Sequence, residues 1–362
     1  MKKKYRITVI GSGDRGGSYM DMLDKYYKEQ VVMAGICDTL PDRQTKALKK
    51  FGFETEHADW QEIIRISKPD IVIIATPAYL HCDIAAFAMQ HGCHVLTEKP
   101  FDLDIAKCFA LREISQRTGK KLAIGLQYRN NHIHRSMKHM FDANVIGTNR
   151  MVFYNDMRMT RPKIAMHDAR YGNGGPFVDM ACHMFDLMRW FYGCDPVSVF
   201  CNWSKSAECR PLLDSIGNKA ADTGAMNITF ADGSIGVITM NWGLPKSVDG
   251  KFTAYAVGSE GLVDLFSIND HKCIEVKVAG GEVLTFNVTS EDEPEVENAE
   301  KTVFDYLIHD IENRGNSQAS FEDGIVSLAC SLAALKSGAL GRPVTLSEIY
   351  AERPSVLEAM HP

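Results

Sequence analysis

Along the first 125 residues, short apolar runs alternate with longer stretches whose apolar positions recur every three or four residues. The short runs, which predict strands, span residues 6–10, 31–37, 71–75, 94–96 and 122–125. Residues 71–75 are apolar throughout, which is typical of a strand buried on both faces. The stretches between the runs predict helices, and strands that alternate with helices form parallel sheets with crossover connections. We therefore expect an α/β domain over residues 1–125.

Residues that favour helix ends mark several of these helices. Pro41 suits a first helical turn and Gly52 suits the left-handed position after a last turn, so we expect a helix between them. Asp59 is suited to cap a helix that runs to Ser67.

Beyond Gly125 the pattern changes to an α+β type. The expected elements are helices near 134–141 and over 176–192, a strand near 151–157, short β runs between 197 and 288, and helices at 302–313 and 324–337. Turn signals separate the β runs, which favours an open antiparallel sheet. We predict a second domain over 126–337 and a C-terminal segment, 338–362, that can pack back on the first domain. The acidic stretch 291–300 is expected to be a solvated loop.

A glycine-rich turn follows the first predicted strand and opens the first helix. It has the spacing GxGxxG and comprises Gly11, Ser12, Gly13, Asp14, Arg15 and Gly16. Gly11 permits a tight turn, Gly13 lets a pyrophosphate approach the backbone, and Gly16 allows close packing of helix on strand. The free N–H groups and the helix dipole then face the anion. At the start of a βαβ unit, this turn predicts a dinucleotide site.

Asp38 stands at the end of the second predicted strand, about 20 residues after the last glycine of the turn. A carboxylate there can accept hydrogen bonds from the adenosine ribose hydroxyls and would repel a 2′-phosphate, so NAD is the expected cofactor. Arg15 and Arg43 are near enough in sequence to keep NADP as an alternative.

A charged pair follows the strand at 94–96. Glu98 and Lys99 stand at the carboxyl end of this strand, which is the edge where open parallel sheets bind ligands. A lysine near the positive nicotinamide ring has its charged form disfavoured. Lys99 can therefore take part in proton transfer or polarise an oxygen.

A second polar pair lies in the expected helix 176–192. Asp179 and His183 are four residues apart, which places both side chains on one helix face. A carboxylate beside an imidazole sets its tautomer and supports the proton that it gains. We predict a catalytic triad in which His183 takes a substrate hydroxyl proton, Asp179 orients His183 and Lys99 orients the hydroxyl. The roles of Lys99 and His183 could be exchanged.

These motifs together resemble one known family. Residues 91–100 (HGCHVLTEKP), with Pro77 and His81 before them, are similar to the strand and EKP motif of the glucose-fructose oxidoreductase / inositol dehydrogenase / MocA family. The segment 125–129, the turn 144–147, the glycine-rich entry to the Asp–His pair and the ending 341–344 fit the same family. The chain departs from the family pattern at 180–182, where relatives often carry a glycine, and at Asn173.

The resemblance implies a Rossmann domain and an open antiparallel sheet with the active site between them, and a cis peptide bond before Pro100. It also implies homo-oligomer formation through the outer face of that sheet. Besides the glycine turn, Asp38 and Arg43, the cofactor-binding residues expected are Ala75, Thr76, Pro77, His81, Glu98, Lys99 and Gln127. The substrate-binding residues expected are Lys99, Tyr128, Arg129, Arg158, Asp179 and His183.

Composition and charge narrow the classes of partner. The 362 residues are 45% hydrophobic, which fits a globular protein of two domains, and the formal charge of −6 argues against nucleic acid. No apolar run approaches the ~20 residues of a membrane span, and residues 7–10 lead into a glycine turn rather than a leader cleavage site. The ten cysteines are scattered, so we expect reduced thiols, a cytoplasmic protein and no metal site.

The sequence therefore predicts a NAD-dependent oxidoreductase that oxidises a secondary hydroxyl of a sugar, cyclitol or glycoside. In one variant, oxidation at C3 of a glycoside by tightly held NAD acidifies the neighbouring C–H and prepares elimination of the glycosidic bond. A NAD-dependent glycosidase would oxidise only transiently and give net hydrolysis. A non-catalytic sensor of dinucleotide and sugar is the alternative of a different class.

Overall fold

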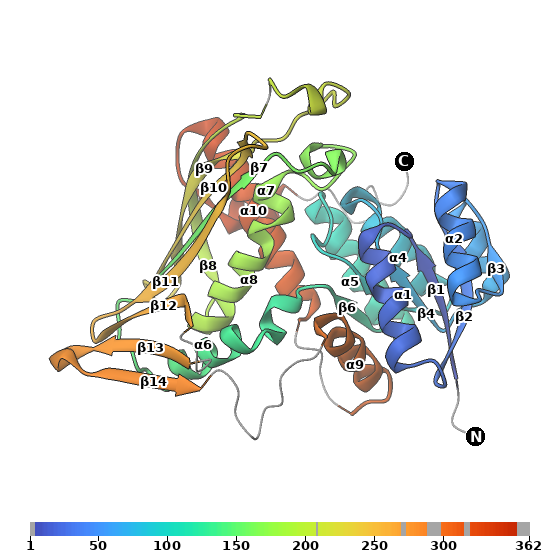
Figure 1. Ribbon diagram of the computed structural model, residues 1–362, viewed down its shortest axis with the longest axis horizontal. Helices are drawn as coiled ribbons and strands as arrows, with labels where there is room; N and C mark the ends of the chain where they lie inside the picture. Colours follow the sequence, from blue (N-terminus) through green and yellow to red (C-terminus); the bar gives the residue numbers. More distant parts are fainter. Residues whose placement is uncertain (1–3, 208, 269–272, 288–297, 315–318, 353–362) are drawn as a thin grey trace. The chain divides into compact units, whose positions relative to one another are not determined.

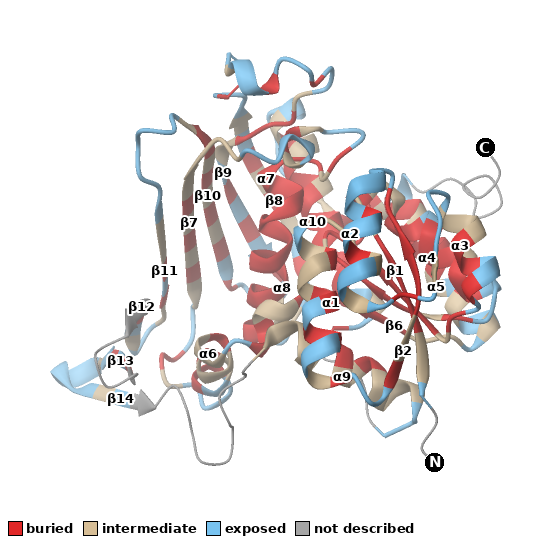
Figure 2. Cartoon of the chain, turned by 45° about the vertical axis from the view of Figure 1, so that its right-hand side comes forward, coloured by how far each residue is buried: buried red, intermediate tan, exposed pale blue. Residues whose placement is uncertain are grey.

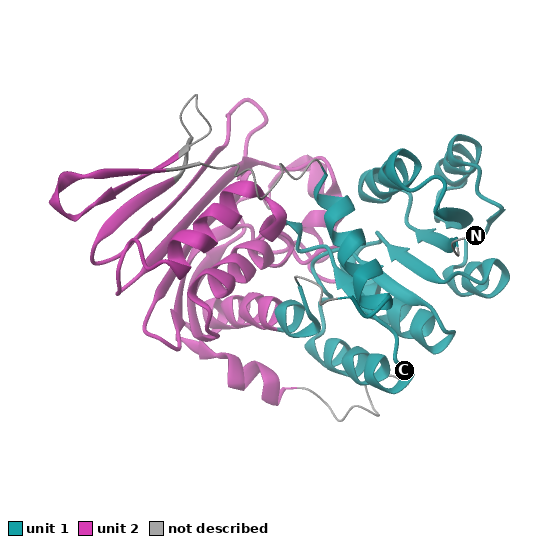
Figure 3. Ribbon diagram, turned by 90° about the horizontal axis from the view of Figure 1, so that it is seen from below, with its two compact units in different colours: residues 1–127, 298–325, 354–362 teal, residues 128–297, 326–353 magenta. Residues whose placement is uncertain are grey.

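The structure is a computed structural model that describes residues 4–207, 209–268, 273–287, 298–314 and 319–352. The chain forms two compact units (Figure 3). Unit 1 contains the described residues up to Gln127 and those between Asn298 and Ile325. Unit 2 contains those from Tyr128 to Asn287 and from Val326 to Glu352. Each unit has a β-sheet of its own.

Unit 1 is built on a six-stranded sheet of order β3-β2-β1-β4-β5-β6, in which all neighbours pair in parallel. Its strands are β1 (Tyr5–Ile10), β2 (Val31–Cys37), β3 (Thr55–Glu56), β4 (Ile71–Ile74), β5 (His94–Thr97) and β6 (Leu122–Ile124). The predicted parallel sheet is confirmed. The strand order reverses at β1, whose neighbours are β2 and β4, and ligands bind at such reversals in open α/β sheets.

Helices pack against this sheet in two groups (Figure 1). The first group is α1 (Asp14–Tyr26), α2 (Pro41–Phe51) and α9 (Ala299–Ile311); the second is α3 (Trp60–Ser67), α4 (His81–Gln90) with the short 3-10 helix η1 (Ala78–Leu80), and α5 (Ile105–Thr118). The predicted helix ends are confirmed, because Asp59 accepts the N–H groups of the first turn of α3 and Gly52 closes α2 in the left-handed conformation.

Helix α9 belongs to unit 1 although most of the second sheet precedes it in the chain. Its Val303, Phe304 and Leu307 are buried in one core with residues of α1, β1 and β6. The predicted range 126–337 assigns these residues to the second domain, whereas their apolar side chains complete the core of unit 1. The domain bounds themselves stay a prediction.

Unit 2 contains a nine-stranded sheet of order β14-β13-β12-β11-β7-β10-β9-β8-β15. Its strands are β7 (Met151–Met159), β8 (Pro196–Ser204), β9 (Thr223–Phe230), β10 (Ile235–Leu244), β11 (Lys251–Val257), β12 (Gly261–Ile268), β13 (Cys273–Val278), β14 (Val283–Asn287) and β15 (Val344–Thr345). The neighbours β7 and β10 are parallel and the other pairs are antiparallel, so the predicted antiparallel sheet contains one parallel pair. Buried and more exposed residues alternate along the central strands, which leaves one face for the core (Figure 2).

The remaining helices are α6 (His132–Asp142), α7 (Pro176–Asp179), α8 (Ala181–Tyr192), α10 (Phe321–Leu340) and α11 (Leu346–Ala351), with the 3-10 helices η2 (Gln127–Asn130), η3 (Ile164–His167), η4 (Pro211–Leu213) and η5 (Ala279–Gly281). Helix α8 packs on β10. Of the segment predicted to pack back on the first domain, residues 353–362 lie outside the described residues, and β15 pairs with β8 in unit 2. Within the described chain, α10 alone has the length and composition of a membrane span, a weak indication because 67% of its apolar window is buried.

The single helix predicted over 176–192 is in fact two helices. They meet at Met180, which belongs to neither helix and whose φ of −109° lies outside the usual helical range, with ψ at −42°. The N–H of Met180 closes α7 on the carbonyl of Pro176, and the carbonyl of Met180 accepts the N–H of His183 at the start of α8. The catalytic pair predicted to share one helix face therefore lies on either side of a break.

Candidate active site

The glycine turn lies at the point where the strand order of unit 1 reverses. Gly11 follows β1 with a φ of +91°, and a Cβ there would be 2.6 Å from the carbonyl oxygen of Ala75, which follows β4. A Cβ at Gly16 would be 1.9 Å from the carbonyl oxygen of Gly11. Real Cβ atoms cannot approach so closely, so only glycine lets α1 begin tightly against this turn. Gly13 is the residue before α1, and because it has no side chain the N-terminus of α1 is open to an anion.

Asp38, predicted to bind the ribose, follows β2 and is held in one orientation. One carboxylate oxygen accepts the backbone N–H (2.8 Å) and the hydroxyl (2.7 Å) of Ser12, and the other accepts the N–H of Leu40 (2.9 Å). Asp38 is thereby fixed against the glycine turn. Arg43 also lies at this edge, where its guanidinium would be 3.6 Å from a Cβ on Gly13.

His81, predicted to bind the cofactor, is buried and joins two loops. Its Nδ1 is 2.8 Å from the carbonyl oxygen of Pro100, and its Nε2 is 2.9 Å from that of Thr76. His81 thus ties the segment after β4, which contains Ala75, Thr76 and Pro77, to the segment that carries Lys99. The peptide bond between Lys99 and Pro100 is cis, as the family resemblance implied.

Glu98 and Arg15, two further predicted cofactor residues, bind each other. The buried Glu98 carboxylate accepts hydrogen bonds from Arg15 (2.8 Å) and from the hydroxyl of Tyr19 (2.8 Å). Arg15 also pairs with Glu300 of α9 at 2.7 Å. Burial by itself lowers the pKa of Arg15, but attraction to Glu98 raises it above the usual value, so the cation is stable here. Glu300 was expected in a solvated acidic loop, and only the return of α9 to unit 1 explains its contact.

In unit 2, Asp179 ends α7 and His183 lies in the first turn of α8, and both side chains are 2% exposed. The side-chain amide of Asn173 donates a hydrogen bond to Asp179 at 2.8 Å. Asn173, noted as a departure from the family pattern, is therefore a partner of the predicted catalytic carboxylate.

Tyr128 and Arg129, both predicted to bind substrate, contact α8. The Tyr128 ring stacks on the His183 imidazole, with centroids 4.0 Å apart and planes at 6°. Arg129 forms a buried bidentate ion pair with Asp186, in which Nε lies 2.8 Å from one carboxylate oxygen. Asp186 is 1% exposed.

Arg158, the remaining predicted substrate residue, lies at the end of β7. Its Nε donates to the fully buried Asp156, and its guanidinium carbon is 5.5 Å from the centre of the Trp242 ring. The other end of the guanidinium reaches the sulfur of Met180, the residue between Asp179 and α8, at 4.0 Å. Arg158 thus lies beside the break that separates the predicted catalytic pair.

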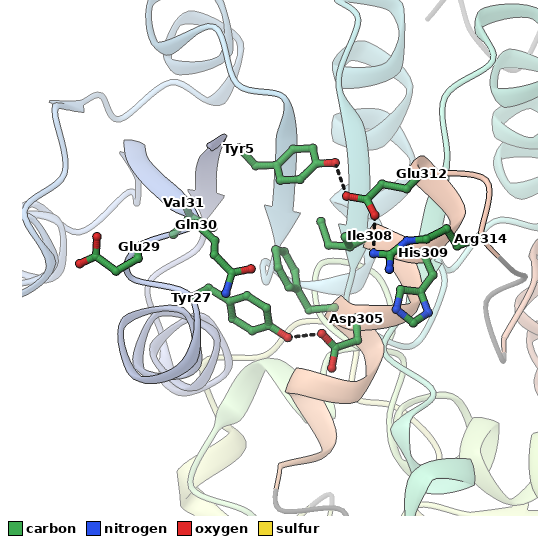
Figure 4. A pocket seen from close by; sticks show the side chains of 11 residues that line it. Tyr5, Tyr27, Glu29, Gln30, Val31, Asp305, Ile308, His309, Glu312 and Arg314 are labelled. Atoms are coloured by element: carbon green, nitrogen blue, oxygen red, sulfur yellow. Dashed lines mark hydrogen bonds and ion pairs between the residues drawn. The ribbon is translucent and has the colours of Figure 1, made fainter. Parts of the chain in front are cut away.

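A cavity of about 620 Å³ in unit 1 is not part of this chemistry (Figure 4). It lies at the amino ends of β1 and β2, the edge opposite to the glycine turn. Its polar groups bind one another: Tyr27 donates to Asp305, and Tyr5 donates to Glu312. We assign it no ligand. Within the described residues, no group of three or more His, Cys, Asp or Glu side chains could hold a metal ion.

Two observations test whether unit 1 fits a dinucleotide. The turn at Gly11 and Gly16 is packed so closely that added side chains would displace backbone, as a phosphate-binding turn requires. At the end of the same unit, the buried side-chain oxygen of Gln127 has no hydrogen-bond partner in the described structure, so it can accept one from a bound group. The residues present fit the cofactor.

Two family models match the chain. An oxidoreductase-family model with an NAD-binding Rossmann fold matches residues 5–126, and the model of the GFO/IDH/MocA C-terminal domain matches residues 134–264. The chain belongs to the GFO/IDH/MocA oxidoreductase family. The resemblance inferred from the motifs is confirmed, and the chain is an NAD-dependent oxidoreductase with a Rossmann domain and a mostly antiparallel second sheet.

Relatives in the GFO/IDH/MocA family match nearly the whole chain. The chain is 25% identical over 349 residues to myo-inositol 2-dehydrogenase of Thermotoga maritima, an alignment that covers 95% of this chain and 99% of the relative. It has the fold of scyllo-inositol dehydrogenase from Lactobacillus casei with bound NAD(H) and scyllo-inositol (TM-score 0.76, 20% identity, covering 95% and 100%). It also has the fold of a levoglucosan dehydrogenase in complex with NADH and levoglucosan (TM-score 0.80, 21% identity, covering 95% and 99%).

Proposed function

We propose that this oxidoreductase oxidises a secondary hydroxyl of a sugar, cyclitol or glycoside. The observation that carries the proposal is the buried pair Asp179 and His183, two ionisable side chains that lie among the buried apolar residues of α7 and α8. Burying such groups is costly, and they cluster at functional sites. The relatives named above act, by name, on myo-inositol, scyllo-inositol and levoglucosan, which are rings bearing several secondary hydroxyls.

In this proposal three side chains act on one hydroxyl. His183 takes its proton, Asp179 keeps the imidazole in the tautomer that can do so, and Lys99 holds the hydroxyl oxygen. Arg158 completes the substrate site, and Tyr128 and Arg129 support it through their contacts with His183 and Asp186. NAD, when bound, accepts the hydride from the carbinol carbon.

The cofactor in this proposal is held by residues of unit 1. Gly11, Gly13 and Gly16 form the phosphate turn, Asp38 binds the adenosine ribose and Gln127 accepts a hydrogen bond with its free oxygen. Ser12, Asp14, Arg43, Ala75, Thr76, Pro77 and Lys99 are the further contacts proposed. Arg15, His81 and Glu98 also belong to this site, where their observed bonds to neighbouring segments fix its walls.

The test is a screen of polyols and glycosides with NAD and with NADP, following NADH or NADPH absorbance and, separately, sugar release. We expect NADH formation with at least one cyclic polyol and preference for NAD. His183→Ala should lower turnover by about 10²–10⁴ while NAD binding is unchanged, and Lys99→Met should lower turnover by a similar factor. His139→Ala, an exposed histidine of α6, is the matched control and should retain full turnover. Sugar release without net NADH would instead identify a glycosidase, and full turnover of His183→Ala would refute the assignment.

We also propose a homo-oligomer formed through the outer face of the sheet in unit 2. Val237, Phe153 and Tyr255 occupy matching positions on the adjacent strands β10, β7 and β11, opposite the buried positions of those strands. The Phe153 and Tyr255 rings stack there at 4.7 Å, and Tyr255 is 38% exposed. Light scattering of the wild type and of Tyr255→Lys tests this, since the charge should shift the mass towards the monomer.

A further inference from the structure

Residues 128 and 129 contact helix α8 at two points, one helical turn apart. The Tyr128 ring lies flat on the His183 imidazole, and the Arg129 guanidinium binds the Asp186 carboxylate. His183 and Asp186 are three residues apart on α8 and therefore lie on the same side of the helix. The short helix η2 is thus fixed to α8 where the proposed proton acceptor lies.

Tyr128 is itself held by a second histidine. His134 of α6 has its Nδ1 2.9 Å from the carbonyl oxygen of Tyr128, and its ring is roughly parallel to that of Tyr128 (13°, centroids 5.8 Å apart). A carbonyl oxygen only accepts hydrogen bonds, so Nδ1 of His134 carries the proton. Burial lowers the pKa of His134 to about 4, which keeps this ring neutral at physiological pH. The phenol ring is therefore fixed through its own backbone.

We propose that Tyr128 is a positioning residue for His183, a role that rests on the proposed function. Rotation of an imidazole about its last side-chain bond is only weakly restricted by its own geometry. A flat contact on the ring face fixes the plane of the imidazole and therefore the directions in which its two nitrogens point. A nitrogen directed in this way can accept the substrate proton, and misplacing such a group by about 1 Å can cost about 100-fold in rate.

In this proposal Tyr128 supports turnover through its aromatic face. In the alternative it would do so through a contact of its hydroxyl with substrate. Tyr128→Phe keeps the face and removes the hydroxyl, whereas Tyr128→Leu removes both. We expect Tyr128→Phe to stay within about twofold of wild-type kcat and Tyr128→Leu to lose about 10- to 100-fold in kcat, with KM for the polyol and the Kd for NAD little changed. Equal losses in both variants would overturn the proposal, and so would wild-type kcat in Tyr128→Leu.

Tyr192→Leu is the matched control for general destabilisation. Tyr192 is also buried, at the end of α8, and its hydroxyl donates to the carbonyl of Ile235, away from His183. This variant should unfold more easily than the wild type while its kcat is retained. A fall of kcat in Tyr192→Leu as large as in Tyr128→Leu would show that loosening unit 2 suffices, which would refute a specific role for the stack.

A spectroscopic measurement tests the stack without catalysis. In the full chain with labelled histidine, the imidazole C–H signals of His183, identified by their loss in His183→Asn, should be shifted upfield by the Tyr128 ring. The shift should persist in Tyr128→Phe and disappear in Tyr128→Leu. An unshifted wild-type signal overturns the proposal even if the leucine variant does not fold. If the shift is present but His183→Ala keeps full turnover, the proposed function fails and the stack stands.

Discussion

The two units hold their candidate functional groups by different means. In unit 1 the backbone does so: Gly11 and Gly16 allow contacts that a Cβ would prevent, and Asp38 is fixed by N–H groups. In unit 2 side chains hold side chains, through the stack of Tyr128 on His183 and the ion pair of Arg129 with Asp186. We therefore expect NAD binding in unit 1 to be lost when a side chain is added to the glycine turn. In unit 2 we expect the candidate catalytic groups to be disturbed when one member of a contacting pair is removed.

The largest effect in unit 1 is expected from Gly16→Ala. Its Cβ would lie 1.9 Å from the carbonyl oxygen of Gly11, so the turn must move, and NAD affinity should fall by about 100-fold or more by calorimetry. Gly17→Ala is the matched control, because a Cβ there has nothing within 4 Å. That variant should bind NAD normally and be about 0.5–1 kcal/mol more stable, since alanine favours helix. Equal affinities in the two variants would contradict a backbone-built turn.

In unit 2, Arg129→Met should destabilise the protein by about 3–5 kcal/mol in urea unfolding, because it leaves the Asp186 carboxylate buried without its cation. Asp195→Asn breaks the Arg189–Asp195 pair, whose side chains are 24% and 64% exposed, and should cost less than about 1 kcal/mol. If both variants lost equally little unfolding free energy, the buried pair would not stabilise unit 2 as proposed.

His134 gives unit 2 a pH dependence. Its pKa is about 4 in the folded protein and about 6.5 when unfolded, so the unfolded state binds the extra proton between these values. The contribution of His134 is complete above about pH 6.5 and is lost as pH falls towards 4, at up to about 1.4 kcal/mol per pH unit. His134→Gln can still donate to the Tyr128 carbonyl but does not titrate. Its unfolding free energy should therefore fall less steeply between pH 7 and 4, and parallel curves would argue against this assignment.

The smallest effect is expected at the cap of α3 in unit 1. Asp59→Ala should cost about 1 kcal/mol, whereas Asp59→Asn keeps the cap and should cost only a few tenths at neutral pH. Hydrogen bonds from the backbone N–H of Glu62 and Gln61 lower the pKa of Asp59, so its contribution is present at neutral pH and is lost on acidification below the usual carboxylate range. An alanine variant as stable as the asparagine variant would show that the cap does not contribute to stability.

The features that could be predicted from the sequence are those that depend on neighbouring residues. The strands of unit 1, its helix caps and its glycine turn depend on residues within a few positions of one another, and local periodicity and turn chemistry specify them. The cis bond before Pro100 and the family also followed from contiguous motifs. The family models confirm the family, and the structure confirms the strands and the cis bond.

The features that were missed depend on contacts between distant segments. The break at Met180 interrupts a stretch with an unbroken helical pattern, and nothing in 176–192 marks it. The stack of Tyr128 on His183 joins residues 55 apart in the chain, and the Arg15–Glu300 pair joins residues 285 apart. A charged residue in an acidic run gives no sign of a distant partner, so Glu300 appeared solvated. The division of labour between Lys99, Asp179 and His183 remains a proposal.

The return of α9 has a consequence for how the protein is made. Val303, Phe304 and Leu307 belong to the first core, and Glu300 binds Arg15 in the glycine turn. A ribosome must therefore complete most of the polypeptide before the nucleotide-binding half can close. Until then the nascent chain exposes the apolar side of α1 and β1, a surface that chaperones bind. An isolated fragment ending at Gln127 should accordingly aggregate, whereas the same fragment joined to residues 298–314 should stay dispersed.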